Sequence, residues 1–293
     1  MACPAAFDYA RGNTGGETGV AFRPIRAWCA VLPLLALALL VSGQPVTADD
    51  GVATALVVSV DVSGSVDETR YQLQMEGIAE ALEDGAVLAA IQANPGGIYF
   101  ALVTWADGAR LAVDWRRIAS KADAAATARL VRAVPRIPGE FTCVGQMLRT
   151  VSASVVPRLP VAADRVVIDV SGDGIDNCSD MDAIHTERDA LLASGTTING
   201  LPILVPGEND VVGVGAYRAP GYGLRELPRQ TYRDGTTLDA WYREHIVGGP
   251  GHFILAARGY GDFARALRQK FVMEISGLAP GETVDEPRSV ASR

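Results

Sequence analysis

The chain has 293 residues, of which 48% are hydrophobic, so it is long enough to bury the core of one large domain or two small ones. Its formal net charge at neutral pH is −8, and its basic residues stand in short, scattered groups. Nucleic-acid binding depends on concentrated Lys and Arg that neutralise phosphates. We therefore expect no nucleic-acid partner.

The N-terminal segment has the layout of a secretory signal peptide. Residues 27–41 form an apolar block, two arginines stand shortly before it, and Val46 and Ala48 follow at the −3 and −1 positions of a small-residue cleavage site. We therefore expect residues 1–48 to be removed after Ala48, which makes the protein periplasmic or secreted. The alternative is an uncleaved segment that associates with a membrane, although its 15 apolar residues are fewer than the ~20 that a spanning helix needs.

From residue 52 onward, strand-like and helix-like segments alternate. The first strand, residues 52–60, is apolar without interruption, which is typical of a strand buried on both faces of a parallel sheet. Ser65 and Glu68 match a capping box, with Ser65 as the N-cap, so a helix should follow. Further strands are predicted at 98–105, 109–115, 165–170, 196–204 and 252–257, and further helices at 122–134, 144–155, 180–193, 238–247 and 262–275.

This order predicts an α/β fold, a doubly wound, mostly parallel sheet with helices on both faces, over residues 52–278. Only Ala-Asp-Gly separates the second and third strands, so the third should be an antiparallel edge strand. Residues 206–235 are rich in Gly and Pro and are predicted to form a long loop. Residues 279–293 are polar and are predicted to be a disordered tail.

Oxygen-bearing side chains follow two of the predicted parallel strands. Asp61, Ser63 and Ser65 come directly after the first strand, and Asp173 lies in a Gly-Asp-Gly after the fourth. Thr142 stands between them in the sequence, at the start of a predicted helix. Ligands of such sheets bind outside the carboxyl ends of the strands, so these side chains should meet in one crevice. Two carboxylates and three hydroxyls suit a hard divalent cation such as Mg²⁺.

Taken singly, several of these acidic and hydroxyl residues have simpler explanations. Ser65 is explained by the helix cap, and Asp173 by a turn, in which Asp-Gly is common. Asp107 is interpreted as a hairpin residue, and Asp176 as part of a solvated helix start. The combination of two acidic loops at one end of the sheet is what favours a metal site.

In type and order, the five residues resemble the metal-ion-dependent adhesion site of von Willebrand factor A-type domains, whose pattern begins with D-x-S-x-S. Over most of the predicted domain, the chain is similar to an uncharacterised bacterial family of secreted proteins with such a domain, including the segments INGLPIL and GGPGHFILAA. The resemblance implies a Rossmann-like fold and Mg²⁺ or Mn²⁺ bound by these five residues. It also implies ligand binding rather than catalysis.

The loop before Thr142 departs from the family pattern. Glu140 and Phe141 stand where such domains often have two glycines, which puts the position of Thr142 in question. Cys143 follows Thr142, and Cys178 lies shortly after the second acidic loop. If the two loops meet, these thiols are close enough for a disulfide, which an oxidising compartment would preserve. The alternative is two small buried thiols.

The leading hypothesis is therefore a binding module that recognises a carboxylate of a protein or peptide through the metal. The alternative is a metal-assisted phosphoryl-transfer hydrolase with Asp61 as its nucleophile. Phosphatases of that kind usually carry a second Asp two residues later, where this chain has Ser63. A third hypothesis is a structural subunit whose site no longer holds metal.

Overall fold

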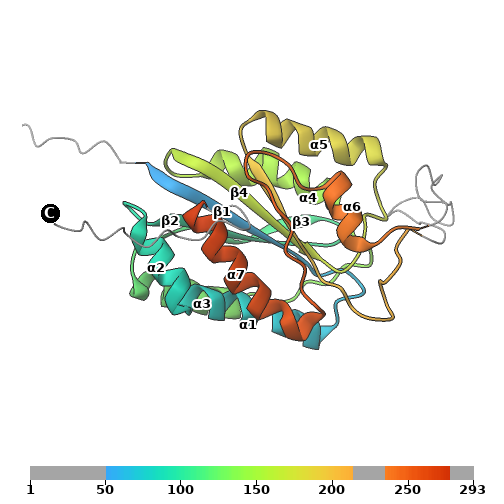
Figure 1. Cartoon of the computed structure of the whole chain (residues 1–293), viewed down its shortest axis with the longest axis horizontal. Helices are drawn as coiled ribbons and strands as arrows, with labels where there is room; N and C mark the ends of the chain where they lie inside the picture. The colour runs from blue at the N-terminus through green and yellow to red at the C-terminus, as the bar shows by residue number, and fades with distance from the viewer. Residues whose placement is uncertain (1–50, 214–234, 278–293) are drawn as a thin grey trace, which may run out of the picture. The chain divides into compact units, whose positions relative to one another are not determined.

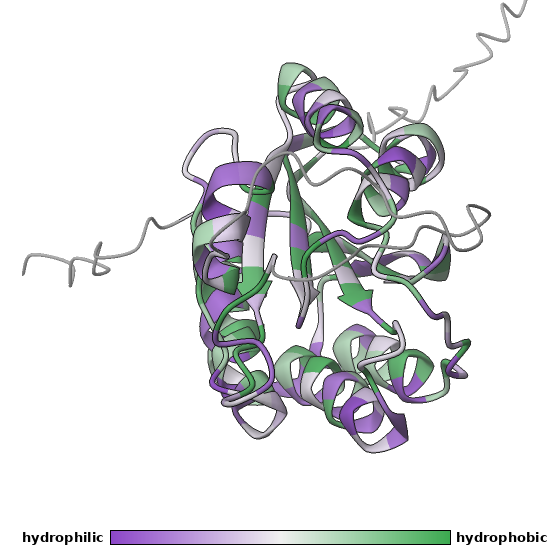
Figure 2. Ribbon diagram, turned by 90° about the vertical axis from the view of Figure 1, so that its right-hand side faces the viewer, coloured by the Kyte–Doolittle hydropathy of each residue, from purple (hydrophilic) through white to green (hydrophobic). Residues whose placement is uncertain are grey.

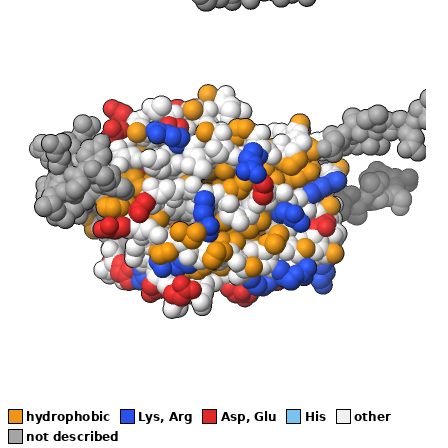
Figure 3. All heavy atoms as spheres, turned by 180° about the vertical axis from the view of Figure 1, so that it is seen from behind, with side chains coloured by type: hydrophobic (Ala, Val, Ile, Leu, Met, Phe, Trp, Pro, Cys, Tyr) orange, Lys and Arg blue, Asp and Glu red, His pale blue; other side chains and the backbone are white. Residues whose placement is uncertain are grey.

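The computed structural model describes residues 51–213 and 235–277. The predicted signal peptide with its cleavage site, most of the predicted 206–235 loop, and the predicted tail lie outside these residues. Within the described ranges, no helix combines the length and the apolar character that a membrane crossing requires. On the face shown in Figure 3, acidic and basic side chains are interspersed.

Five strands form one sheet in the order β3-β2-β1-β4-β5. They are β1 (Val52–Asp61), β2 (Ile98–Trp105), β3 (Ala109–Ile118), β4 (Ala163–Gly172) and β5 (Thr197–Pro202). β1 pairs in parallel with β2 and β4, and β4 with β5, whereas β3 is antiparallel to β2. β1 and β2 are almost completely buried, as their unbroken apolar sequences predict. The mostly parallel sheet with one antiparallel edge strand confirms the predicted fold class.

Helices cover both faces of the sheet (Figure 1). One layer consists of α1 (Glu68–Glu83), α2 (Gly85–Ala93), α3 (Lys121–Arg132) and α7 (Phe263–Ser276). The other consists of α4 (Val144–Thr150), α5 (Met181–Ala193) and α6 (Leu238–His245). Short helical segments complete the fold: a π-helical turn at Val151–Val155 and 3₁₀ turns at Val156–Arg158 and Tyr260–Asp262. Figure 2 shows the apolar strands enclosed between two layers of amphipathic helices.

The first helix does not use the predicted cap. Asp67 is the N-cap of α1, and its side chain accepts a hydrogen bond from the backbone N–H of Arg70 at 2.8 Å. Ser65 lies outside the helix, and its hydroxyl donates to Asp173. The prediction of Ser65 as the helix cap was therefore wrong, because Asp67 satisfies the first turn and a long-range contact holds Ser65.

The predicted strand at 252–257 does not form a regular strand. This segment runs beside β5 and makes two isolated bridges, which pair Gly200 with Ile254 and Ile203 with Ala257. Pro202 lies between the two bridges and has no N–H to donate to the neighbouring backbone. The prediction was wrong because it overlooked this interruption, and the segment borders the sheet as an irregular edge.

The strand order places the topological switch point of the sheet between β1 and β4. The chain passes from β1 to β2 on one side, and β4 lies on the other side of β1. In doubly wound sheets, ligands bind at such a switch point, outside the carboxyl ends of the strands. The register pairs Val60 with Ser171, so the two strands end next to each other. Asp61 and Asp173 both lie at this end of the sheet.

Candidate metal centre

The structure brings the five predicted ligands together, while their role as metal ligands stays a prediction. Asp61 ends β1, Asp173 directly follows β4, and Thr142 lies two residues before α4. Ser63 and Ser65 belong to the loop between β1 and α1. Ser65 is exposed and the other four are buried, so the group lies beneath the surface with one hydroxyl at its rim.

The three hydroxyl groups form one hydrogen-bonded chain that ends on a carboxylate. Thr142 Oγ1 donates to Ser63 Oγ at 3.3 Å, and Ser65 Oγ donates to Asp173 Oδ1 at 2.6 Å. The Oγ atoms of Ser63 and Ser65 are 3.3 Å apart. Because the single hydroxyl hydrogen of Ser65 goes to Asp173, Ser63 is the donor to Ser65. Each hydroxyl oxygen keeps a lone pair that a cation can use.

Asp61 is fully buried, and only one of its carboxylate oxygens is hydrogen-bonded. Oδ1 accepts from the backbone N–H of Ser63 at 2.7 Å, whereas Oδ2 has no hydrogen-bond partner among the described residues. Burial and, to a smaller extent, the nearby Asp173 raise the pKa of Asp61 to about 8. A buried oxygen without a partner lowers stability unless a proton or a cation meets it.

Gly172 leaves space beside this oxygen. A methyl group on Gly172 would lie 3.1 Å from Asp61 Oδ2 and 3.0 Å from the hydroxyl of Tyr242. Tyr242 is fully buried, and its hydroxyl makes no hydrogen bond within the described part of the chain. Burial raises the pKa of Tyr242 well above its ordinary value, so it stays protonated. The free carboxylate oxygen and this O–H therefore lie close to the same small space.

Asp173 is held by three residues that the sequence did not single out. The hydroxyl of Tyr260 donates to Oδ2 at 2.9 Å, and the guanidinium of Arg70 lies 3.6 Å from the same oxygen. The side-chain amide of Asn209 donates to the backbone carbonyl of Asp173 at 2.9 Å. These residues come from three separate segments, so no local pattern links them to the acidic loop.

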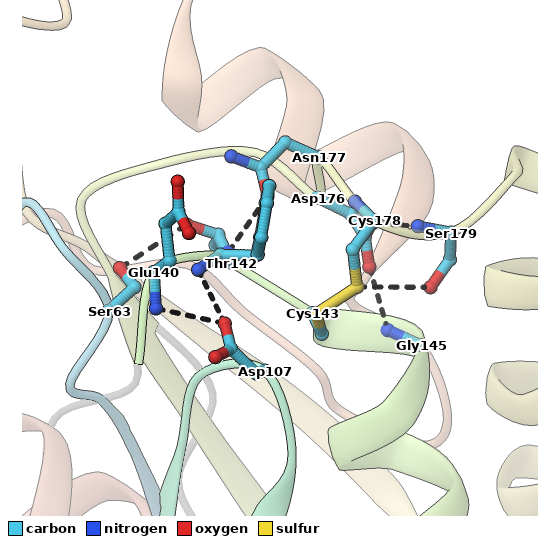
Figure 4. Close-up of a disulfide and its surroundings, with 11 residues drawn as sticks. Ser63, Asp107, Glu140, Thr142, Cys143, Gly145, Asp176, Asn177, Cys178 and Ser179 are labelled. Carbon is cyan, nitrogen blue, oxygen red and sulfur yellow. Dashed lines mark hydrogen bonds between the residues drawn. A yellow bond between two sulfur atoms is a disulfide. The ribbon is translucent and has the colours of Figure 1, made fainter. Parts of the chain in front are cut away.

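Two side chains fix the loop before Thr142 (Figure 4). Asp107 Oδ1 accepts from the backbone N–H groups of Glu140 and Phe141, at 2.9 and 2.6 Å. Asn177 Oδ1 accepts from the N–H of Thr142 at 2.8 Å, and the N–H of Asn177 donates to the Thr142 carbonyl at 3.0 Å. Asp107 lies in the predicted turn between β2 and β3, and it also shapes this loop, where the usual glycines are absent.

The predicted disulfide between Cys143 and Cys178 is present and joins the two loops, with Cα atoms 5.3 Å apart (Figure 4). Asp176 reinforces this junction. Its Oδ1 accepts from the N–H groups of Cys178 and Ser179 at 2.8 and 2.6 Å, and its Oδ2 from the N–H of Gly145 at 2.9 Å. Asp176 is buried, and burial raises its pKa. The prediction of a solvated Asp176 was therefore wrong, because backbone donors of both loops converge on it.

The donor set fits a small, hard divalent cation. Two carboxylates neutralise the charge of the ion, and three hydroxyls supply neutral oxygen ligands or hold its waters. The partnerless Oδ2 of Asp61 is the strongest indication, because a cation at this position would stabilise the ionised form that burial disfavours. Among the residues that the structure describes, no cluster of three or more His, Cys, Asp or Glu side chains is close enough to hold a metal. A centre here therefore depends on its hydroxyls.

In the absence of metal, Asp61 should make the protein less stable as the pH rises. Its folded-state pKa is raised from 3.8 to about 8, so the folded protein holds a proton that the unfolded chain releases. Stability is therefore greatest below pH 4 for this group and declines up to about pH 8, by at most about 1.4 kcal/mol per pH unit. We expect Asp61→Asn to make the decline shallower, while the raised pKa of Asp169 keeps part of it. Urea unfolding in chelator from pH 5 to 9 tests it, and equal slopes for both proteins would contradict it.

Comparison with solved structures identifies the fold as that of von Willebrand factor A-type domains. A von Willebrand factor type A protein from Catenulispora acidiphila gives a TM-score of 0.51 at 16% identity, covering 76% of this chain and 42% of that one. Proximal thread matrix protein 1 from the mussel byssus also gives 0.51 at 16%, covering 76% and 46%. The pilus adhesin SpaC from Lactobacillus rhamnosus GG gives 0.52 at 14%, covering 77% and 30%. The chain thus spans less than half the length of each, and the likeness shows the fold alone.

A further structure of the mussel protein has zinc in its metal-ion-dependent adhesion site (MIDAS) motif. It gives a TM-score of 0.50 at 16% identity and covers 76% of this chain and 46% of that one. No curated protein matches the chain. A family model with the description "Protein of unknown function (DUF1194)" matches residues 51–279, which is most of the sequence. The chain therefore belongs to this family of unknown function, and its fold is of the von Willebrand factor A type.

Proposed function

We propose that the protein is a periplasmic or secreted binding module that recognises a carboxylate of a protein or peptide through a divalent metal ion, Mg²⁺ or Mn²⁺. One observation carries the proposal. The buried Oδ2 of Asp61 has no hydrogen-bond partner within the described structure, and it lies at the end of the sheet where four further oxygen-bearing side chains gather. The full set consists of Asp61, Ser63, Ser65, Thr142 and Asp173.

Each of the five residues would contribute to binding the ion. Asp61 and Asp173 supply the negative charge, and the three hydroxyls supply oxygens without adding more. The bound ion would then supply an electrophilic position that an outside carboxylate can occupy. The disulfide and Asp176 keep the Thr142 loop against the Asp173 loop, so the ligands are positioned before the ion arrives. Such preorganisation lowers the entropic cost of binding.

The comparisons support this proposal at the level of the fold. The zinc-occupied motif of the mussel protein supports a divalent metal in this chain, and the description of SpaC as a pilus adhesin supports a role in binding. Both proteins share only 14–16% of their residues with this chain, so the ion and the ligand are argued from the chain's own residues.

Binding to a peptide array tests the function. Synthetic peptides that contain Asp or Glu are compared with matched peptides that contain Asn or Gln, in Mg²⁺ and in chelator. We expect binding that requires both the acidic side chain and Mg²⁺, that is lost in Asp61→Asn, and that persists in Asp169→Asn. Asp169 is a matched control because it is also a buried acid, but it pairs with Lys270 at 3.0 Å. Binding that ignores the chelator would overturn the proposal.

The same preparations test the hydrolase hypothesis. A generic phosphate ester is supplied with Mg²⁺, and release of phosphate is followed for the wild-type protein and for Asp61→Asn. Turnover by the wild-type protein that disappears in Asp61→Asn would replace the binding proposal with an enzyme in which Asp61 is the nucleophile. No release above the Asp61→Asn background is the result expected of a binding module.

A further inference from the structure

A guanidinium group is fixed at the rim of the candidate metal centre. Arg70 Nη1 donates to the backbone carbonyl of Ser65 at 2.9 Å and lies 3.6 Å from Asp173 Oδ2. The guanidinium also lies over the ring of Tyr260, with its central carbon 5.1 Å from the ring centroid. These contacts hold Arg70 on one side, and 22% of its side chain stays exposed to solvent. A preorganised positive charge therefore faces outward beside the centre.

The outward side of Arg70 is occupied by a carboxylate of the same chain. Arg70 Nη2 donates to Glu208 Oε1 at 2.6 Å, and 53% of the Glu208 side chain is exposed. The backbone next to Glu208 is anchored independently, because Asn209 donates to the carbonyl of Asp173 and accepts from the N–H of Val205. The pair thus forms between two fixed segments and shows that this guanidinium accommodates a carboxylate.

The charges permit an exchange of the Glu208 carboxylate for one from outside. Two aspartates balance the charge of a divalent ion, and Glu208 balances the charge of Arg70. Exposed pairs of this kind contribute little to stability, and Glu208 can return to water at small cost. An incoming acid that replaces Glu208 keeps the charge balance. Its pairing with a planar guanidinium can be bidentate, which fixes orientation as well as charge.

We propose that Arg70 is a second ligand contact and that Glu208 is an internal competitor for it. The ligand then carries two acidic groups, one for the metal ion and one for Arg70, so the partner is an acidic segment of a protein or peptide rather than a single carboxylate. This inference rests on the proposed metal-dependent binding function. It specifies that the ligand carries two negative charges and that Arg70 selects for the second.

The test compares peptides with two Asp, separated by one to four residues, with peptides that carry one Asp at the same position. Affinities are measured in Mg²⁺ for the wild-type protein, Arg70→Gln and Glu208→Gln. The matched control pair is Arg132 with Glu76, an exposed ion pair of 2.8 Å between α3 and α1, through Arg132→Gln and Glu76→Gln. Mn²⁺ binding is titrated for every protein, so that a lost metal centre is told apart from a lost second contact.

The wild-type protein should prefer two-acid peptides, and Arg70→Gln should bind one-acid and two-acid peptides equally. Glu208→Gln should bind two-acid peptides about fivefold more tightly, because the competing pair is gone. The control variants should behave as the wild-type protein. A wild-type protein that binds Mn²⁺ and one-acid peptides, but does not bind two-acid peptides more tightly, would overturn this inference. The proposed function would still stand. A wild-type protein that binds no Mn²⁺ would overturn both.

Discussion

Replacing Asp61 with asparagine is expected to lower the affinity for Mg²⁺ by at least about a hundredfold and to stabilise the metal-free protein at alkaline pH. Changes to residues that merely support a metal ligand cost about 10–100-fold, so the loss of a charged ligand should cost more. The stabilisation follows from the raised pKa of Asp61, since asparagine has the same shape and no charge to bury. Titration calorimetry with Mg²⁺ and urea unfolding in chelator measure the two effects.

The opposite signs of the two effects make this prediction specific. A variant that is merely misfolded would lose both metal affinity and stability. Asp169→Asn serves as the control, since Asp169 is also a buried acid but lies within β4 and has Lys270 as its partner. It should leave Mg²⁺ affinity unchanged. Equal Mg²⁺ affinity of Asp61→Asn and the wild-type protein would remove Asp61 from the metal centre.

Removal of the Cys143–Cys178 disulfide is expected to lower the free energy of unfolding by about 3–4 kcal/mol. The two cysteines are 35 residues apart, and the estimate is the loop entropy that the bond removes from the unfolded chain. Metal affinity should fall as well, because the bond adjoins Thr142 and ties its loop to the loop of Asp173. The double variant Cys143→Ala/Cys178→Ala is compared with the wild-type protein by urea unfolding and Mg²⁺ titration.

A reductant supplies the control for the disulfide. It should lower the stability of the wild-type protein toward that of the double variant and leave the double variant unchanged. A wild-type protein whose stability and metal affinity are the same with and without reductant, although its thiols have become reactive, would contradict the predicted role of the bond. The hydrogen bonds of Asp176 to both loops would then suffice to hold the junction.

The sequence predicted the fold class and the grouping of the five candidate ligands, because both follow from the order and pattern of the strands. Unbroken apolar runs identify buried parallel strands, and β1 and β2 confirm this expectation. The switch-point rule then brings together residues that lie up to 112 positions apart, such as Asp61 and Asp173. The irregular edge beside β5 could also have been predicted from the sequence, because Pro202 stands inside the strand predicted at 196–204.

Contacts between segments that are distant in the sequence could not be predicted from local patterns. Arg70 and Tyr260 look like ordinary helix-associated residues in the sequence, and only the fold brings both to Asp173. Ser65 fits a local capping pattern, yet a carboxylate 108 residues away takes its hydroxyl. Asp176 looks like a solvated helix start because the backbone donors that surround it are invisible until the two loops meet. Local patterns compete with tertiary contacts at such positions, and the tertiary contacts decide.

A titration of chelator-stripped wild-type protein with Mn²⁺, followed by electron paramagnetic resonance of the free ion, is the most direct test of the metal centre. Binding of one Mn²⁺ per chain, displaced by Mg²⁺ and absent in Asp61→Asn, is the predicted result. A free-ion signal that matches buffer alone at every Mn²⁺ concentration would show that Asp61, Ser63, Ser65, Thr142 and Asp173 do not form a metal centre.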